Sequence, residues 1–402
     1  MLTPTSIEAQ VASLQNDPLK VLVVGAGVAG TALTQLLRSQ GLHPLLIERT
    51  GPDSSPGYML GLMPMVDPVI DELGVRPTYL DRSTALARFR FRSHTGRLVR
   101  EDPLGDLMAR YGDYRGISRG DLLDVLSSAG GSVSYQTTVA AIRQDQEQVT
   151  ASLRSSSGQH EVTVEAIVAA DGLHSQTRSL ILDEGAVEFL DTGWGGWVAW
   201  ADADDETDLG EELWGAGFFV GSYPVLGHLG VILCGPADLT RQGSAALVAE
   251  VRRQIDHPEG RVAAALDAIA AADDRYYWAL TDCRASTWSM GRVVLLGDAA
   301  AGFLPTAGIG AGMALESALA LTKELTRTDV KDVPEALRRY EDRQRPRVEA
   351  AQDNSRLLAR LVFRRNRFVA TLRDLIMARV SAKVALGPIH KLLADVPATM
   401  AA

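Results

Sequence analysis

The sequence predicts an α/β fold, α+β overall, that joins a parallel sheet assembled from separate segments to a mostly antiparallel β-sheet domain and a C-terminal helical segment. Two strand–turn–helix patterns, at residues 21–37 and 292–321, indicate the parallel sheet. Between them, from about residue 187 to 282, aromatic residues crowd a strand-rich region. The two patterns lie about 270 residues apart and flank a different domain. We therefore expect the parts of one split domain to meet in space.

The first pattern contains a glycine-rich turn. Four apolar residues, Val21–Val24, indicate a buried parallel strand, and a helical pattern opens at Ala29. Between them Gly25, Gly27 and Gly30 spell G-x-G-x-x-G. In a nucleotide-binding turn the first glycine makes the tight bend, the second lets the backbone approach a pyrophosphate, and the third lets helix and strand pack closely. The helix N-terminus then presents free N–H groups and its positive dipole end to the phosphates.

An acidic residue strengthens this interpretation. The second apolar strand, residues 44–47, ends in Glu48, eighteen residues beyond Gly30. A carboxylate at that position accepts hydrogen bonds from the ribose hydroxyls of an adenosine. The alternative is a structural βαβ unit with a solvated Glu48. The motif predicts a dinucleotide and leaves NAD, NADP and FAD open.

Composition excludes several classes of partner. The 402 residues carry a net charge of −10, which argues against a nucleic-acid-binding face and against electrostatic attachment to anionic lipid. The two cysteines, Cys234 and Cys283, and seven scattered histidines show no metal-ligand spacing, so we expect no metal site. No signal peptide is apparent, and the uncharged run Ala299–Leu315 is broken by Pro305. These features predict a cytoplasmic protein without stable membrane insertion.

Two segments before residue 130 carry candidate functional arginines. Residues 85–100 alternate polar and apolar residues around a Thr95-Gly96 turn, which indicates a hairpin. Its arginine face is either a site for an acidic substrate or, more commonly, a solvated sheet face. Further along, Ser118 or Asp121 is suited to cap a helix, which places Arg119 at the entrance of that helix. There Arg119 is either a phosphate or carbonyl ligand or a surface residue.

Another strand end follows at Ala170-Asp171-Gly172, with Ser175 and Arg178 on the next helical turn. Ligands gather at the carboxyl ends of strands in α/β sheets, although Asp-Gly also occurs in simple turns.

The aromatic-rich region predicts the substrate domain. Most of its aromatic side chains should be core, and a minority should line a pocket. Our candidates for substrate binding are Trp214, Phe218 and Tyr223. One helix, around residues 243–272, interrupts the strands.

The second nucleotide-type pattern begins with the apolar strand at 293–296 and continues through Gly297 and Asp298. Pro305, Gly308 and Gly310 then precede a helix whose N-terminus should face a ligand. The tail, residues 332–402, keeps a helical apolar period decorated with arginines. It either packs on the protein or lies on a membrane surface.

Together these segments resemble the single-component FAD-dependent monooxygenases, the para-hydroxybenzoate hydroxylase-like flavoproteins. The resemblance covers nearly the whole chain. It rests on Gly25–Gly30 with Glu48-Arg49, on Ile117–Leu122, on the Ala170-Asp171-Gly172 segment with Ser175 and Arg178, and on Gly291–Asp298 continuing to Pro305 and Gly308-x-Gly310. Two positions depart from the family pattern: Ala301 stands where many relatives have histidine, and residues 50–75 lack a common arginine.

The resemblance implies a Rossmann-like FAD-binding domain and a role for each matching residue. Glu48 would hold the adenosine ribose, Arg119 would reach the FAD phosphates, and Asp298 would bind the pyrophosphate or ribityl hydroxyls. Asp171 would support FAD and a transient nicotinamide nucleotide. The implied cofactor-binding residues are Gly25, Gly27, Ala29, Gly30, Glu48, Arg49, Arg119, Asp171, Asp298, Pro305, Gly308, Gly310 and Ala311. The last four of these, Pro305 to Ala311, would lie against the isoalloxazine ring.

The resemblance also implies a division into domains. The FAD-binding domain would comprise residues 18–80, 100–182 and 283–335, the substrate domain 81–99 and 183–282, and the C-terminal helices 336–402.

The implied reaction uses NADPH or NADH and O₂ to form a flavin C4a-hydroperoxide, which hydroxylates or epoxidises a hydrophobic, aromatic or polyketide-like small molecule in secondary or catabolic metabolism. The cofactor carries the difficult step, so no catalytic side chain is nominated. Alternatives are a redox-neutral FAD-dependent cyclase or isomerase using the same pocket, a non-catalytic flavin-binding protein, and an NAD-dependent dehydrogenase, which the Gly297-Asp298 segment disfavours.

Overall fold

The computed structural model describes residues 1–52, 57–255, 257–272 and 276–395. It confirms the mixed α/β class, with separate sheets and C-terminal helices. Short elements connect the main ones: β1 (Thr3–Pro4), β4 (Met59–Leu62), η1 (Pro64–Val66), α3 (Asp67–Glu72), α4 (Arg76–Asp81), β5 (Thr84–Ala85), α5 (Leu104–Met108), β8 (Arg115–Ser118), β9 (Ser132–Val133), α7 (Gln176–Ser179), η2 (Glu184–Ala186), α8 (Ala237–Thr240), η3 (Gly297–Ala299), η4 (Pro305–Ala307) and η5 (Val330–Asp332).

The parallel sheet has five strands, in the order β19 (Ser289–Met290), β20 (Val293–Leu295), β13 (Ala166–Ala169), β2 (Val21–Val24) and β3 (Leu45–Ile47). All neighbours run parallel except β19 with β20. Ala169 lies opposite both Val24 and Leu295, so the carboxyl ends of β2, β13 and β20 are adjacent. The two nucleotide-type patterns therefore meet in space, as predicted.

Both faces of the parallel sheet are covered. Val21 and Val23 of β2 pack toward α2 (Val28–Ser39), α6 (Arg119–Leu126) and α11 (Gly310–Leu325). Leu22 and Val24 pack on the other face, toward α1 (Ile7–Leu14) and an antiparallel sheet. That sheet consists of β10 (Thr138–Gln144), β11 (Val149–Ser155) and β12 (Gly158–Val164). Coverage of both faces explains the continuous apolar strands in the sequence.

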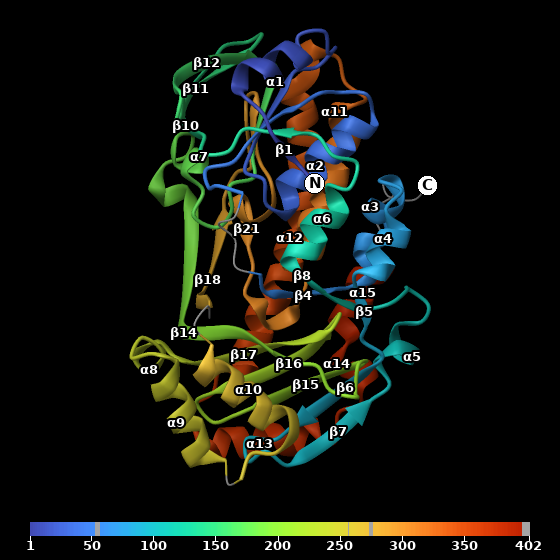
Figure 1. Ribbon diagram of the computed structural model, residues 1–402, viewed down its shortest axis with the longest axis vertical. Helices are drawn as coiled ribbons and strands as arrows, with labels where there is room; N and C mark the ends of the chain where they lie inside the picture. Colours follow the sequence, from blue (N-terminus) through green and yellow to red (C-terminus); the bar gives the residue numbers. More distant parts are fainter. Residues whose placement is uncertain (53–56, 256, 273–275, 396–402) are drawn as a thin grey trace.

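The second large sheet has eight strands in the order β21 (Ala301–Gly302), β18 (Tyr276–Ala285), β14 (Val187–Asp202), β17 (His228–Pro236), β16 (Phe219–Val225), β15 (Leu209–Trp214), β6 (Arg88–Arg92) and β7 (Leu98–Asp102). Its neighbours are antiparallel except β15 with β6. The predicted hairpin at 85–100 supplies β6 and β7. In Figure 1, α1, α2 and α11 lie in the upper half of the molecule and β6, β7, β15, β16 and β17 in the lower half.

Two helices, α9 (Ser244–Gln254) and α10 (Gly260–Ala271), cover one face of the eight-stranded sheet. The prediction of a single helix around residues 243–272 was therefore wrong. Pro258 disfavours a helical conformation in the residue before it, and His257 has a φ of 53°. The chain turns there and begins a new helix.

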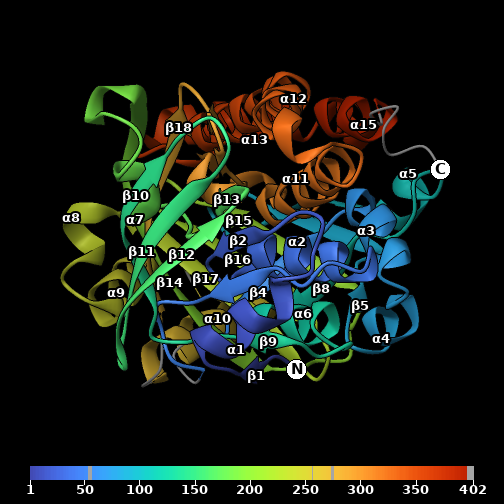
Figure 2. The same ribbon diagram turned by 90° about the horizontal axis from the view of Figure 1, so that it is seen from above.

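The tail is helical, as predicted, and consists of α12 (Val333–Val362), α13 (Arg367–Met377), α14 (Ala382–Ala385) and α15 (Gly387–Ala394). Figure 2 shows α11, α12, α13 and α15 gathered along one side of the molecule. Toward the end of α12, Leu358 and Val362 reach the cavity described below. Phe368, Leu372 and Ile376 of α13 are exposed, so this helix does not bury all of its apolar side chains.

Candidate functional site

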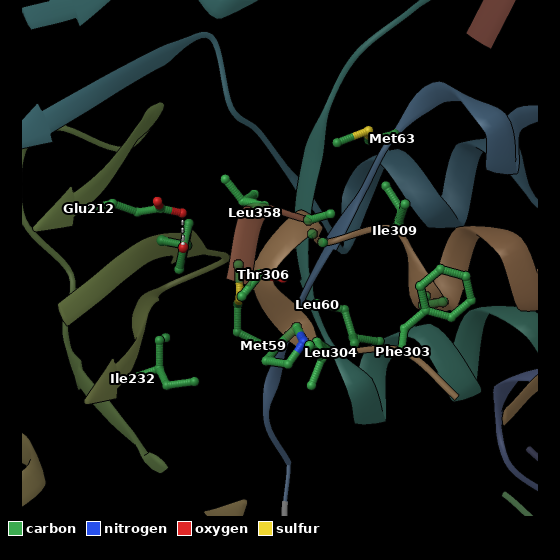
Figure 3. A pocket seen from close by; sticks show the side chains of 18 of the residues that line it. Met59, Leu60, Met63, Glu212, Ile232, Phe303, Leu304, Thr306, Ile309 and Leu358 are labelled. Atoms are coloured by element: carbon green, nitrogen blue, oxygen red, sulfur yellow. Dashed lines mark hydrogen bonds between the residues drawn. The ribbon is translucent and has the colours of Figure 1, made fainter. Parts of the chain in front are cut away.

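A cavity of about 480 Å³ lies between the parallel sheet and the eight-stranded sheet. This volume is within the range of small-molecule and cofactor sites. Its lining comes from the turn between β2 and α2, the end of β13, the start of α11, β4, the cavity-side face of the eight-stranded sheet, and α12. Figure 3 shows side chains from β4, the eight-stranded sheet, the segment before α11, and α12 converging on one space. The cavity therefore joins the two nucleotide-type patterns to the aromatic domain.

The glycine-rich turn forms one end of the cavity. Gly25 has a φ of +102°, and a Cβ there would lie 2.6 Å from the carbonyl oxygen of Ala170. A Cβ on Gly30 would lie 1.9 Å from the carbonyl oxygen of Gly25, so any side chain would force helix and strand apart. Gly27 lines the cavity, and a Cβ there would meet nothing within 4 Å. The turn thus leaves its middle glycine open to a ligand.

Glu48 stabilises this turn by hydrogen bonds to its backbone. Its Oε2 accepts a hydrogen bond from the Ala26 N–H at 2.8 Å, and its Oε1 accepts from the Thr50 N–H and hydroxyl at 2.9 and 2.8 Å. A carboxylate oxygen has two lone pairs, so Oε2 can accept a further hydrogen bond from a ribose hydroxyl.

We expect Glu48→Ala to raise the dissociation constant for FAD about tenfold, because a charge-assisted hydrogen bond and a brace of the turn are lost together. Titration of FAD into apoprotein, followed by flavin fluorescence, measures the change. Glu147→Ala, at an exposed turn in the same half of the molecule, is the matched control. Unchanged FAD affinity in Glu48→Ala would refute the ribose role.

Asp298 lines the cavity from η3, directly after β20. The residue is exposed, and desolvation by the protein around it raises its pKa to about 6. A carboxylate held in this way is suited to accept hydrogen bonds from a bound ligand.

The N-terminus of α11 lies beside Asp298. Pro305, Gly308, Gly310 and Ala311 all line the cavity. The N-cap residue of α11, Ile309, provides no side-chain cap, which leaves the first N–H groups of this helix available to a ligand. Together with the open Gly27 and the Asp298 carboxylate, this helix end fits a dinucleotide cofactor.

Arg119 and Asp171 occupy different positions relative to the cavity. Ser118 caps α6 by accepting from the Asp121 N–H at 2.9 Å, and Arg119 at the first turn lines the cavity, with its guanidinium 5.9 Å from the ring centre of Tyr58. The carboxylate of Asp171 instead accepts from the Ser175 hydroxyl and from the Thr177 N–H at the start of α7.

Arg178 fixes the position of the segment that follows Asp171. It is buried and donates to the carbonyl oxygens of Ala299 and Leu173, each at 2.8 Å. These bonds tie the end of β13 to the loop that carries Asp298.

The predicted cofactor residues therefore fall into two groups. Those that line the cavity are Gly27, Ala29, Arg119, Asp298, Pro305, Gly308, Gly310 and Ala311. Those outside its lining are Gly25, Gly30, Glu48, Arg49 and Asp171, of which Arg49 is exposed.

The aromatic candidates divide in the same way. Trp214 and Tyr223 line the cavity. Phe218 is fully buried on the opposite face of the sheet, where it packs with Leu213 beneath α9 and α10. Its position does not support a role in substrate binding.

Glu212 and Tyr114 line the cavity and were missed from the sequence. Glu212 lies on β15, where its Oε1 accepts from the Tyr223 hydroxyl at 2.5 Å and its Oε2 from the Trp214 indole N–H at 2.7 Å. Burial raises the pKa of Glu212, and these two hydrogen bonds oppose that rise. One signal was available, because Glu212 stands two residues before Trp214 and so shares its face of the strand.

Among the described residues, no helix is both long and apolar enough to cross a membrane.

Comparison with known proteins shows which family has this sequence and fold. Residues 18–355 match the family described as FAD binding domain. A flavin-dependent monooxygenase from an unknown prokaryotic organism is 25% identical over 83% of this chain and 87% of its own length. A 3-amino-4-hydroxybenzoate 2-monooxygenase of Streptomyces platensis is 30% identical over 84% of this chain and 87% of its own. Klebsiella pneumoniae HpxO, solved with FAD and uric acid, has a TM-score of 0.81 at 22% identity and covers 96% of this chain and 99% of its own.

Proposed function

Because the chain belongs to the FAD-binding family of flavin-dependent monooxygenases, we propose that it uses NADPH or NADH and O₂ to hydroxylate or epoxidise a hydrophobic, aromatic or polyketide-like small molecule. The chain is an oxidoreductase with FAD as its cofactor, as the resemblance implied. One observation carries the proposal: a single cavity joins the Asp298 carboxylate and the N-terminus of α11 to the aromatic face of the eight-stranded sheet.

The residues around the cavity supply binding and electrostatics. Glu48 holds the adenosine ribose, Arg119 the phosphates, and Asp298 the pyrophosphate or ribityl hydroxyls. Asp171 acts indirectly, by fixing the strand end beside the cofactor. When bound, FAD supplies electron transfer and oxygen activation. The positive potential at the N-terminus of α11 would stabilise the negative charge of a reduced flavin bound against it.

The substrate half of the cavity favours a flat apolar molecule. Phe91, Trp214, Phe219, Ile232 and Leu358 line it, and such walls exclude water from the reacting centre. The names of similar proteins agree with this class, since one acts on 3-amino-4-hydroxybenzoate and another was solved with uric acid.

We expect the FAD-loaded protein to oxidise NADPH or NADH slowly alone and faster with an aromatic substrate, with one oxygen atom of ¹⁸O₂ appearing in the product. An oxygen electrode and mass spectrometry measure these quantities. Product formed without O₂ or reductant would instead establish a redox-neutral cyclase or isomerase. Absence of turnover across a panel of phenols and fused-ring ketones would favour a non-catalytic flavin-binding protein.

A further inference from the structure

The charged residues that line the substrate half of the cavity are not those of a pocket that binds an aromatic acid, which would need a cation for the carboxylate. Among the described lining residues the arginines are Arg100 and Arg119. Arg100 has its Nε 2.8 Å from Oδ2 of Asp102 and donates to the carbonyl oxygens of Met377 and Val380. Arg119 lies at the start of α6, over Tyr58, toward the parallel sheet. Of the described residues of the eight-stranded sheet, Arg100 is therefore the arginine that reaches the cavity, and it has a carboxylate beside it.

The arginines of β6 do not supply the missing cation. Arg88 binds Asp208, with Nη2–Oδ1 at 2.6 Å, and Arg90 binds Glu206, with Nη2–Oε1 at 2.8 Å. Arg92 binds Glu211, with Nε–Oε1 at 2.9 Å, and none of these three arginines lines the cavity. Of the two interpretations of the arginine face, a site for an acidic substrate or a solvated sheet face, the structure supports the sheet face, with its arginines in ion pairs.

Glu212 instead places a carboxylate in this half of the cavity. In Figure 3 its side chain extends from the sheet toward the centre of the space, across from Ile309 and Phe303 on the side of α11. Both of its protein partners are donors, so both oxygens act as acceptors. Each oxygen therefore has a lone pair left for a ligand.

The surrounding residues fix Glu212 in that position. Gly221 lies directly across from Glu212 in the β15–β16 pair, and a Cβ at Gly221 would lie 3.0 Å from the Tyr223 hydroxyl oxygen. The absence of a side chain at Gly221 lets the Tyr223 ring fold over the strand and reach Glu212. A second glycine, Gly210, has a Cβ position 3.5 Å from the same ring. The acceptor is thus built into the sheet.

Tyr114 adds a second polar group toward the cofactor end. A Cβ on Gly61 would lie 2.1 Å from its hydroxyl oxygen and one on Gly308 would lie 3.1 Å away. This hydroxyl therefore sits between β4 and the start of α11. Burial and the charge of Glu212 raise the pKa of Tyr114, which keeps the phenol protonated and able to donate. A substrate between Glu212 and Tyr114 meets an acceptor on one side and a donor on the other.

Resting on the proposed function, we propose that Glu212 determines substrate specificity by accepting a hydrogen bond from an O–H or N–H group of the substrate. The site then takes aromatic molecules that present such a donor toward β15 and rejects those that present a carboxylate there. An anionic group would meet the Glu212 charge, and among the described residues the sheet arginine in the lining, Arg100, already has Asp102 beside it.

Equilibrium binding to the FAD-loaded protein tests this without turnover. The probes are 2-naphthol, 2-methylnaphthalene and 2-naphthoate, which share one ring system, and the readout is the change in the absorption spectrum of the bound flavin at about pH 8, where naphthol is neutral and an ordinary carboxyl ionised. We expect 2-naphthol to bind about tenfold more tightly than 2-methylnaphthalene, and 2-naphthoate to bind most weakly. Equal or tighter binding of 2-naphthoate, or failure of all three probes to bind, would overturn the proposal.

Variants assign the effect to one residue. Glu212→Gln keeps the size of the side chain and should reduce the preference for 2-naphthol over 2-naphthoate about tenfold. Tyr223→Phe, which removes one donor to Glu212, should change it less. Glu101→Gln, on β7 and outside the cavity lining, should leave it unchanged. An unaltered preference in Glu212→Gln overturns the assignment. If Glu212→Gln does not retain flavin, an unaltered preference in Tyr223→Phe overturns it instead.

The outcome is independent of the oxygenation test. A clear preference for 2-naphthol that depends on Glu212, in a protein that never consumes O₂, would refute the proposed function and leave this inference standing. Substrate-stimulated O₂ consumption with no such preference would do the reverse.

Discussion

Asp298→Ala is expected to abolish stable FAD binding and yield a folded, colourless protein. Asp298 is the carboxylate that the second nucleotide-type pattern delivers to the cavity. Desolvation by the surrounding protein raises its pKa to about 6, while part of the residue stays accessible to a ligand. Hydrogen bonds to a charged group are stronger than those between neutral groups, and we expect the dissociation constant for FAD to rise about a hundredfold.

The ratio of flavin absorbance to protein absorbance after gel filtration measures this loss. Circular dichroism establishes that the variant is folded. Asp205→Ala, at an exposed loop before β15, is the matched control and should retain full flavin content. Stoichiometric flavin in Asp298→Ala would show that Asp298 has no role in holding the cofactor. The effect should exceed that of Glu48→Ala, because Glu48 already has three donors within the protein.

The parallel sheet could be predicted from the sequence because its signals are local. Apolar runs such as Val21–Val24 followed at once by glycine mark buried strands and the turns after them. Parallel strands end at one edge, so Gly25, Ala170 and Gly297 had to approach one another once all three were assigned to one sheet. The cap of α6 was also local, since Ser118 bonds a residue only three positions away.

The substrate side could be predicted only in part, because it depends on which face of the sheet each residue occupies. Phe218 and Phe219 are adjacent and equally apolar, yet only Phe219 lines the cavity. Which one does so is set by pairing across strands, such as Trp214 with Phe219. Glu212 was missed for the same reason, since its partner Tyr223 comes from the next strand.

A buried ion pair ties the C-terminal helices to the eight-stranded sheet. Arg356 of α12 donates to both oxygens of Asp282 on β18, at 2.9 and 2.8 Å. Asp282 is fully buried, and its hydrogen bonds raise the pKa of Arg356. Arg356→Met should therefore lower the free energy of unfolding by about 3–5 kcal/mol, because it leaves an uncompensated charge in the interior.

Urea denaturation of the FAD-loaded protein measures this change, with Arg360→Met at the exposed next turn as the control that should alter stability by less than about 0.5 kcal/mol. Combining Arg356→Met with Asp282→Leu should recover most of the loss, since an apolar pair of similar volume replaces a buried ion pair at little cost. If the double variant is no more stable than Arg356→Met, the cost lies in packing around α12 rather than in the unpaired charge.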